Sequence, residues 1–220
     1  MSDEKMKRTI EYVAPMEIEK RSFEIIAAEL KEQGITLPED KAFIIMRAIH
    51  TSADFEYANT LRFSENAIEK MAALLREGAT IITDTNMGLS GINKTELEKY
   101  GCKACCFMAD PQIASEAKER GLTRAAVSME HAASLPGKKI FVVGNAPTAL
   151  ITLREMYDEG IFTADFVIGV PVGFVNVEVS KEMIMETEIP YIVNQGRKGG
   201  SNIAAALCNA VLYEMRKGRI

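Results

Sequence analysis

These 220 residues lack a long apolar run, a secretory signal and an excess of basic residues, and each absence argues against a class of protein. No run of eighteen apolar residues occurs, so no membrane-spanning helix is expected. The N-terminal segment is polar and lacks the apolar core of a secretory signal, which predicts a cytoplasmic protein. Basic residues are outnumbered, 26 against 31 acidic ones, and the resulting net charge of −5 argues against a general nucleic-acid surface.

Two nucleotide-binding motifs are also absent. A Walker loop needs four residues between its first glycine and Gly-Lys-Ser or Gly-Lys-Thr, and no stretch fits that spacing. The dinucleotide motif Gly-x-Gly-x-x-Gly does not follow any expected strand. A nicotinamide or flavin enzyme is therefore disfavoured.

Cysteines are few and unevenly placed. Cys102, Cys105 and Cys106 form a cluster whose spacing superficially suggests a metal or redox site, whereas Cys208 stands alone in an apolar helical pattern. A zinc or iron–sulfur site would need further ligands. Because Cys105 and Cys106 open an apolar run typical of a buried strand, we interpret the thiols as core residues and predict no metal site.

What is present predicts one α/β domain over residues 1–220, with a polar lead at residues 1–11. An apolar content of 47% is enough for one substantial core. The N-terminal third is expected to be helical, with one helix from Pro15 to about Gly34 and a second that begins at Pro38 and ends at His50.

From Thr80 onward, continuously apolar runs alternate with helical stretches. This alternation predicts a mainly parallel sheet of about five strands with helices on both faces. The expected strands are residues 80–83, 104–108, 140–143, 166–170 and 191–193, and the expected helices are residues 95–100, 111–119, 123–133, 148–158, 176–186 and 201–215.

Four loops that follow the expected strands are rich in glycine, asparagine, threonine and proline. Ligands of open parallel sheets bind beyond the carboxyl ends of the strands, where glycine-rich backbone lets them approach N–H groups. One such loop is explained by ordinary turns, but four at one sheet edge favour a binding crevice. The candidate binding residues are Thr83, Asp84, Thr85, Met87, Asn145, Ala146, Pro147, Val172, Gly173, Phe174, Gly196, Arg197, Lys198, Gly199 and Ser201.

Other candidates lie on helices. Ser22 interrupts an apolar helix face, and its hydroxyl either bonds to the preceding turn or faces a ligand. Arg124 opens a helix, where a cation opposes the helix dipole, and forms either a surface ion pair or a contact to an anionic ligand. Lys181 is either solvated or ligand-facing, and His131 is interpreted as a surface histidine.

His50 is the candidate for proton chemistry. It stands where an apolar helical pattern gives way to Thr51, Ser52 and Asp54, and it is one of only two histidines. Imidazole can give or take a proton near neutral pH. The structural alternative is a histidine that only caps carbonyls at a helix end.

Together these motifs resemble the precorrin-8X methylmutases of cobalamin biosynthesis, especially their cobalt-precorrin-8 branch. The resemblance extends from about Tyr12 to Tyr213. It rests on six segments in the family's order: residues 18–23, 49–55, 83–87, 144–150, 171–175 and 196–201.

The resemblance implies a homodimeric isomerase that moves a methyl group from C-11 to C-12 of a corrinoid macrocycle, giving cobyrinate or hydrogenobyrinate. This formal 1,5-sigmatropic shift needs no cofactor, and any cobalt arrives with the substrate. By the same resemblance, His50 is the catalytic residue and gives a proton or hydrogen bond to the macrocycle, while Ser22 and Arg124 line the pocket. We also hypothesise that the dimer partner completes each pocket.

Two other functions are compatible with parts of the sequence. The first is a non-catalytic carrier that binds a corrinoid and hands it on. The second is an unrelated α/β enzyme that binds a phosphorylated metabolite through residues 196–201. The six ordered segments favour the methylmutase over both.

Overall fold

The structure is a computed structural model that describes residues 10–220. Residues 1–9 of the expected polar lead lie outside the described residues. Contacts divide the chain into two compact units, Met1–Thr36 and Leu37–Ile220. The assignment of residues 1–220 to one domain stays a prediction.

The N-terminal unit contains the helix that the sequence predicts. A 3-10 turn, η1 (Pro15–Glu17), leads directly into α1 (Ile18–Glu32), and Gly34 follows the helix with a φ of 70°. Proline supplies a helical φ without losing a needed N–H, and glycine tolerates the left-handed turn that ends the helix. The apolar face of α1 is only partly covered, because Ile26 and Leu30 are buried while Ile18 and Ile25 are exposed.

The second unit is built on a six-stranded sheet in the order β1-β6-β5-β4-β2-β3. β1 pairs antiparallel with β6, and all other neighbours are parallel. This confirms the predicted mainly parallel sheet, with one strand more than expected. The strands are β1 (Leu61–Phe63), β2 (Thr80–Thr83), β3 (Lys103–Cys105), β4 (Lys139–Val143), β5 (Phe166–Gly169) and β6 (Tyr191–Asn194).

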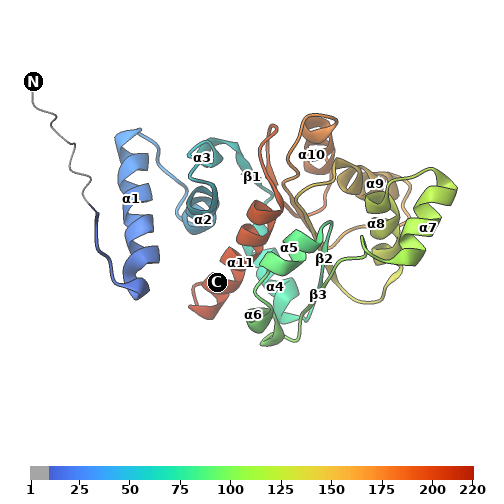
Figure 1. Ribbon diagram of the computed structural model, residues 1–220, viewed down its shortest axis with the longest axis horizontal. Helices are drawn as coiled ribbons and strands as arrows, with labels where there is room; N and C mark the ends of the chain where they lie inside the picture. The colour runs from blue at the N-terminus through green and yellow to red at the C-terminus, as the bar shows by residue number, and fades with distance from the viewer. Residues whose placement is uncertain (1–9) are drawn as a thin grey trace, which may run out of the picture. The chain divides into compact units, whose positions relative to one another are not determined.

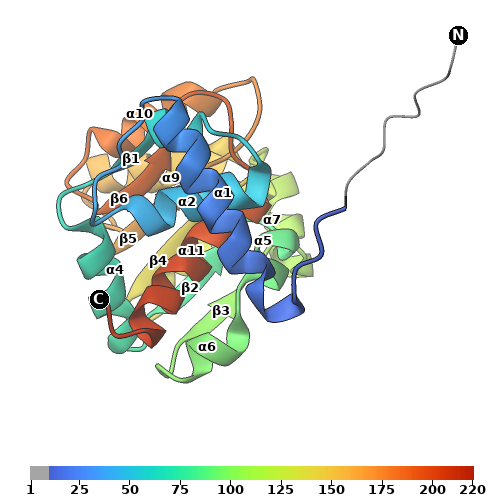
Figure 2. The same cartoon turned by 90° about the vertical axis from the view of Figure 1, so that its left-hand side faces the viewer.

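Helices cover both faces of this sheet, which is why its central strands are apolar throughout. Every residue of β4 and β5 is buried. Figures 1 and 2 show α2, α4, α5, α6 and α11 on one side of the sheet, and α7, α8, α9 and α10 on the other. Their bounds, with the short α3, are α2 (Ala42–Ser52), α3 (Tyr57–Thr60), α4 (Ala67–Arg76), α5 (Asn86–Gly91), α6 (Lys94–Glu98), α7 (Pro111–Arg120), α8 (Arg124–Ser134), α9 (Pro147–Asp158), α10 (Val177–Met185) and α11 (Ser201–Arg216).

Three local predictions need correction. The strand expected at residues 104–108 is the short edge strand β3, so Cys105 and Cys106 are half-buried rather than enclosed. The segment expected to be a loop after β2 contains α5, which Thr85 caps by accepting a hydrogen bond from the Gly88 N–H. β1 was not predicted, because three residues with an exposed arginine at the centre give no strand signal.

The described residues include no helix that is long and apolar enough to cross a membrane. Cys102 and Cys208 are buried free thiols, which agrees with the interpretation of these two as core residues. Within residues 10–220, no group of three or more histidine, cysteine or acidic side chains is arranged to hold a metal ion.

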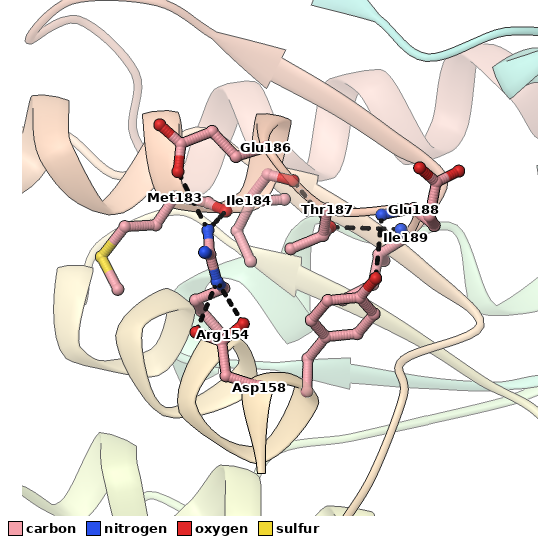
Figure 3. A network of polar contacts seen from close by, with 9 residues as sticks. Arg154, Asp158, Met183, Ile184, Glu186, Thr187, Glu188 and Ile189 are labelled. Carbon is pink, nitrogen blue, oxygen red and sulfur yellow. Dashed lines mark hydrogen bonds and ion pairs between the residues drawn. The ribbon is translucent and has the colours of Figure 1, made fainter. Parts of the chain in front are cut away.

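Arg154 fastens α9 to the C-terminal end of α10 (Figure 3). Its Nε donates to Asp158 Oδ2 at 2.8 Å within α9, and its Nη1 donates to the Met183 carbonyl at 2.5 Å and to Glu186 Oε2 at 3.2 Å. A guanidinium suits this role because its five N–H donors lie in one plane and point in different directions within it, so one side chain can bind several acceptors. α10 is therefore anchored on the side away from the loops at the sheet's carboxyl edge.

Candidate active site

The four loops that the sequence selected follow neighbouring parallel strands. In the register of the sheet, Thr83 lies opposite Val142, Val143 opposite Gly169, and Gly169 opposite Val193. The chain therefore leaves β2, β4, β5 and β6 at one edge. This edge is where a ligand of an open parallel sheet binds.

Asp84 holds two of these loops together. Its carboxylate is buried and accepts three backbone hydrogen bonds, from the N–H groups of Gly144 at 2.9 Å, Asn145 at 2.7 Å and Ala146 at 2.6 Å. Burial raises the pKa of Asp84, and the three N–H donors oppose that rise. With its oxygens engaged in this way, Asp84 shapes the loop that carries Asn145 and Ala146.

The N-terminus of α11 packs tightly into the same edge. Ser201, its first residue, shares a 2.7 Å hydrogen bond between hydroxyls with Thr85. A Cβ on Gly144 would lie 2.5 Å from the Ser201 Cα, so only glycine fits there. These contacts place helix-terminal N–H groups of α11 and α9 at the edge of the sheet, where they favour an anion.

His50 lies in the last turn of α2 and is exposed. The hydroxyls of Thr51 and Ser52 each donate back to a carbonyl one turn earlier, at 2.8 Å, and Ala53 ends the helix in the left-handed conformation with a φ of 55°. The small hydroxyl residues after the histidine thus shape a sharp helix exit. They leave the imidazole on the outer surface of the helix end.

Lys198 ties this helix exit to the loop after β6. Its Nζ lies 2.6 Å from Asp54 Oδ2 and 2.7 Å from Glu56 Oε2. The ammonium holds the pKa of Asp54 below its usual value. Since the same loop leads into Ser201, the ion pairs bring the C-terminal end of α2 to the carboxyl edge of the sheet. His50, Lys198 and Ser201 therefore belong to one region of the second unit.

An acid–base group, helix N-termini and cations at one sheet edge suit a large anionic substrate. The sequence model of one family, described as precorrin-8X methylmutase, matches residues 17–214. The chain belongs to the precorrin-8X methylmutase family.

Individual methylmutases agree with this membership. The cobalt-precorrin-8 methylmutase of Salmonella typhimurium is 42% identical over 208 residues, covering 92% of this chain and 97% of its own. The precorrin-8X methylmutase of Pseudomonas aeruginosa is 37% identical, with 90% and 94% covered. The crystal structure of the precorrin-8X methylmutase from Thermus thermophilus superposes with a TM-score of 0.84 at 35% identity, covering 93% of this chain and 98% of that one.

Arg124 of this methylmutase lies at the same edge of the second unit. It is exposed at the first position of α8, and the preceding Thr123 donates through its hydroxyl to that of Thr148 on α9 at 2.9 Å. Pro147 begins α9 directly after Ala146, which Asp84 binds. The N-termini of α8 and α9 thus meet beside the loop after β4.

Ser22 belongs to the other unit of the methylmutase, Met1–Thr36. Its hydroxyl donates to the Ile18 carbonyl at 2.9 Å, which is the local bond that the sequence offered as one alternative. This bond leaves the lone pairs of the serine oxygen for a ligand. The role of Ser22 in the pocket stays a prediction.

The cations and apolar residues predicted at the edge are exposed. Arg197 forms an ion pair with Glu178 at 2.6 Å, and its guanidinium lies 5.6 Å from the ring centre of Phe174. Phe174 is 83% exposed and Met87 is 70% exposed. Exposed ion pairs contribute little to stability, so an anionic ligand can replace the acidic partner of a cation such as Arg197. Val172 is exposed too.

The sequence did not reveal the residues that fix these loops. Lys181 is fully buried, so neither of the two alternatives offered for it, solvated or ligand-facing, describes it. Asp54 and Glu56 were not predicted as partners of Lys198. The only signal in the sequence was the presence of opposite charges. Asp54 and Glu56 precede Lys198 by 144 and 142 positions, and spacing in the sequence does not indicate which acidic residue a lysine contacts over such a separation. His131 is exposed as predicted, and its ring packs on Phe107.

Proposed function

We propose that this protein catalyses the migration of a methyl group from C-11 to C-12 of cobalt-precorrin-8, giving cobyrinate. The match to the methylmutase family over residues 17–214 carries this proposal. The reaction is an isomerisation, so atoms and electrons balance without a co-substrate or a redox cofactor. The relatives from Salmonella typhimurium and Leptospira interrogans, at 42% and 41% identity, are both named cobalt-precorrin-8 methylmutases, which favours the metallated substrate over the metal-free one.

His50 is proposed as the catalytic residue. Protonating a ring nitrogen of the macrocycle, or donating a strong hydrogen bond to it, polarises the conjugated system and lowers the barrier to methyl migration. The exposure of His50 at the end of α2 supports this role, because a large rigid ring needs an accessible donor. The protein supplies the proton donor, and any cobalt belongs to the substrate.

The acetate and propionate arms of the substrate are proposed to bind the cations and N–H groups at the carboxyl edge. Arg124, Arg197 and Lys198 are exposed there, and guanidinium groups bind carboxylates through two parallel hydrogen bonds. The N-termini of α9 and α11 add backbone donors. Met87, Val172 and Phe174 are proposed to contact the flat apolar ring.

We further propose that the enzyme is a cytoplasmic homodimer whose partner subunit completes each pocket. Two observations support the dimer. The N-terminal unit exposes Tyr12 and Met16 at 90% and 91%, and Phe174 is similarly exposed in the second unit. Tyr12, Met16 and the neighbouring Ile18 expose large apolar side chains within one short segment. Apolar exposure that is clustered in this way is typical of surfaces that another chain covers.

The dimer is expected to disappear when its apolar surface is charged. Light scattering should give the wild-type protein a mass of twice 24.3 kDa and the variant Met16→Glu a mass near 24.3 kDa. Lys31→Glu, which changes an exposed residue near the far end of α1, the helix that follows Met16, should remain dimeric. A wild-type monomer at micromolar concentration would contradict the proposal.

The function itself is tested by incubating the purified protein with cobalt-precorrin-8 and following the visible spectrum. Migration of the methyl group changes the ring conjugation, so the spectrum should convert over many turnovers to that of cobyrinate. A stoichiometric spectral change without turnover would favour the corrinoid carrier instead. No change with either the metallated or the metal-free substrate would contradict both functions.

A further inference from the structure

Lys181 is a buried lysine that the proposed reaction does not use. Its side chain is 0% exposed, and its Nζ donates to the carbonyl oxygens of Gly196 at 2.6 Å and Lys198 at 2.9 Å. Burial lowers the pKa of Lys181 to about 8, which reflects the cost of placing an ammonium in this site. A methionine would fill the same space without the cost of burying a charge. What lysine adds at this position is the two hydrogen bonds of its ammonium group.

Lys181 binds residues 196–198, part of a glycine-rich segment whose backbone has many accessible conformations. Gly196, Gly199 and Gly200 have φ values of 81°, 159° and 135°, which residues with a side chain rarely adopt. Glycine-rich backbone loses more conformational entropy on ordering than any other. Lys181 offsets that loss with two charge-assisted bonds to carbonyls, which are stronger than bonds between neutral groups.

Lys181 thereby fixes the direction of two cations. The Gly196 and Lys198 carbonyls point to the buried ammonium, while the side chains of Arg197 and Lys198 are exposed. The Lys198 carbonyl also accepts a 2.9 Å bond from the amide of Asn194, which holds the loop to the end of β6. Turning the carbonyls inward leaves the charged side chains of the loop at the carboxyl edge.

The same contacts extend to the helix end that carries His50. Lys198 binds Asp54 and Glu56 at 2.6 and 2.7 Å, four and six positions after the histidine. A shift of the Lys198 backbone would therefore displace the segment that follows α2, or break its ion pairs with Lys198. Four groups are linked in a row: the Lys181 ammonium, the 196–198 backbone, the Lys198 side chain and the acids that follow α2.

We propose that Lys181 is a positioning residue for substrate binding, which holds residues 196–198 so that Arg197 and Lys198 present their charges to the substrate carboxylates. This inference rests on the proposed methylmutase function. Lys181 does not touch the reacting atoms. Its loss is therefore expected to weaken the binding of the substrate more than it slows the methyl shift.

The test compares steady-state kinetics of wild-type protein and Lys181→Met on cobalt-precorrin-8. Because misplacing a binding group by about 1 Å can cost on the order of 100-fold in catalytic efficiency, we expect KM to rise about tenfold and kcat to change less than about threefold. Lys181→Gln keeps N–H donors on a side chain one atom shorter, and its KM should lie between the two. Hydrogen exchange of the amides in residues 194–200 should accelerate in Lys181→Met.

Lys139 provides a matched control. It is also a buried lysine, its Nζ donates to the Gly137 carbonyl at 2.9 Å, and it begins β4 at the opposite edge of the sheet. Lys139→Met should lower the stability of the protein while KM and the exchange of residues 194–200 stay at wild-type values. The control separates the general effect of removing a buried ammonium from the effect on the loop.

Each result decides the proposal. A KM within twofold of wild type in Lys181→Met overturns it, as does a loss confined to kcat. If Lys181→Met does not fold, Lys181→Gln carries the same comparison. If wild-type protein turns over neither the metallated nor the metal-free substrate, the methylmutase function fails, and loop exchange alone then tests the role of Lys181: wild-type protection of residues 194–200 in Lys181→Met overturns it.

Discussion

Replacing His50 with alanine is expected to reduce kcat on cobalt-precorrin-8 by about 1,000-fold, within the range of about 100- to 10,000-fold that a positioned acid or base contributes. This corresponds to about 4 kcal/mol of transition-state stabilisation. KM should change little, because the carboxylate arms bind elsewhere. The fold should be retained, since His50 is exposed in the last turn of α2 and a histidine there stabilises a helix by no more than about 1 kcal/mol.

The second histidine provides the control for this experiment. His131 is exposed on α8, and its ring lies edge-on to Phe107 at 4.6 Å between centroids. His131→Ala should keep wild-type kcat. If His50→Ala instead retains turnover within threefold of wild type, proton donation from this imidazole is not part of the reaction, and the loops would have to account for the whole rate enhancement.

The sequence predicts most of the framework of the site because its signals are local. β2 starts and ends at the predicted residues, and β4 and β5 each differ by a single residue at one end, since these strands are covered on both faces and are therefore continuously apolar. Once the strands are known to be parallel, topology alone brings the loops that follow them to one edge. The break in the apolar helical pattern likewise predicted that His50 lies near a helix end, although α2 begins at Ala42 rather than Pro38 and ends two residues after His50, at Ser52.

The partners of the charged groups could not be predicted, because they depend on contacts between distant segments. Lys181 stands between Ser180 and Glu182 in an amphipathic helix, a context that fits a solvated lysine equally well. Its burial follows from the path of residues 196–198, fifteen or more positions away. Asp84 likewise attracts attention as a polar residue at a strand end, but its three N–H partners come from a loop that begins sixty positions later.

Replacing Asp84 with alanine is expected to lower the free energy of unfolding by about 4 kcal/mol. The substitution leaves the N–H groups of Gly144, Asn145 and Ala146 without their acceptor at a site where Asp84 is buried, and each buried donor without a partner costs about 1–3 kcal/mol. Asn145 is exposed, so water can accept a hydrogen bond from its N–H group and recover part of that cost. Denaturant unfolding followed by circular dichroism measures the change.

Asp84→Asn distinguishes loss of the acceptors from loss of packing. The amide has nearly the shape of the carboxylate, but only one of its two ends can accept, so its NH₂ group must face either the Gly144 N–H or the Asn145 and Ala146 N–H groups. We expect a loss of about 2–3 kcal/mol, because at least one donor loses its acceptor and meets another donor instead. Asp110→Asn is the matched control, because the half-buried Asp110 accepts a single N–H, from Gln112 at 2.8 Å, in a hydrogen bond exposed to solvent. Asparagine caps a helix about as well as aspartate, so this variant should keep wild-type stability. Wild-type stability in Asp84→Asn would mean that the loop after β4 keeps its shape without the carboxylate, and the position of Asn145 and Ala146 would then have to come from the packing of Gly144 against Ser201.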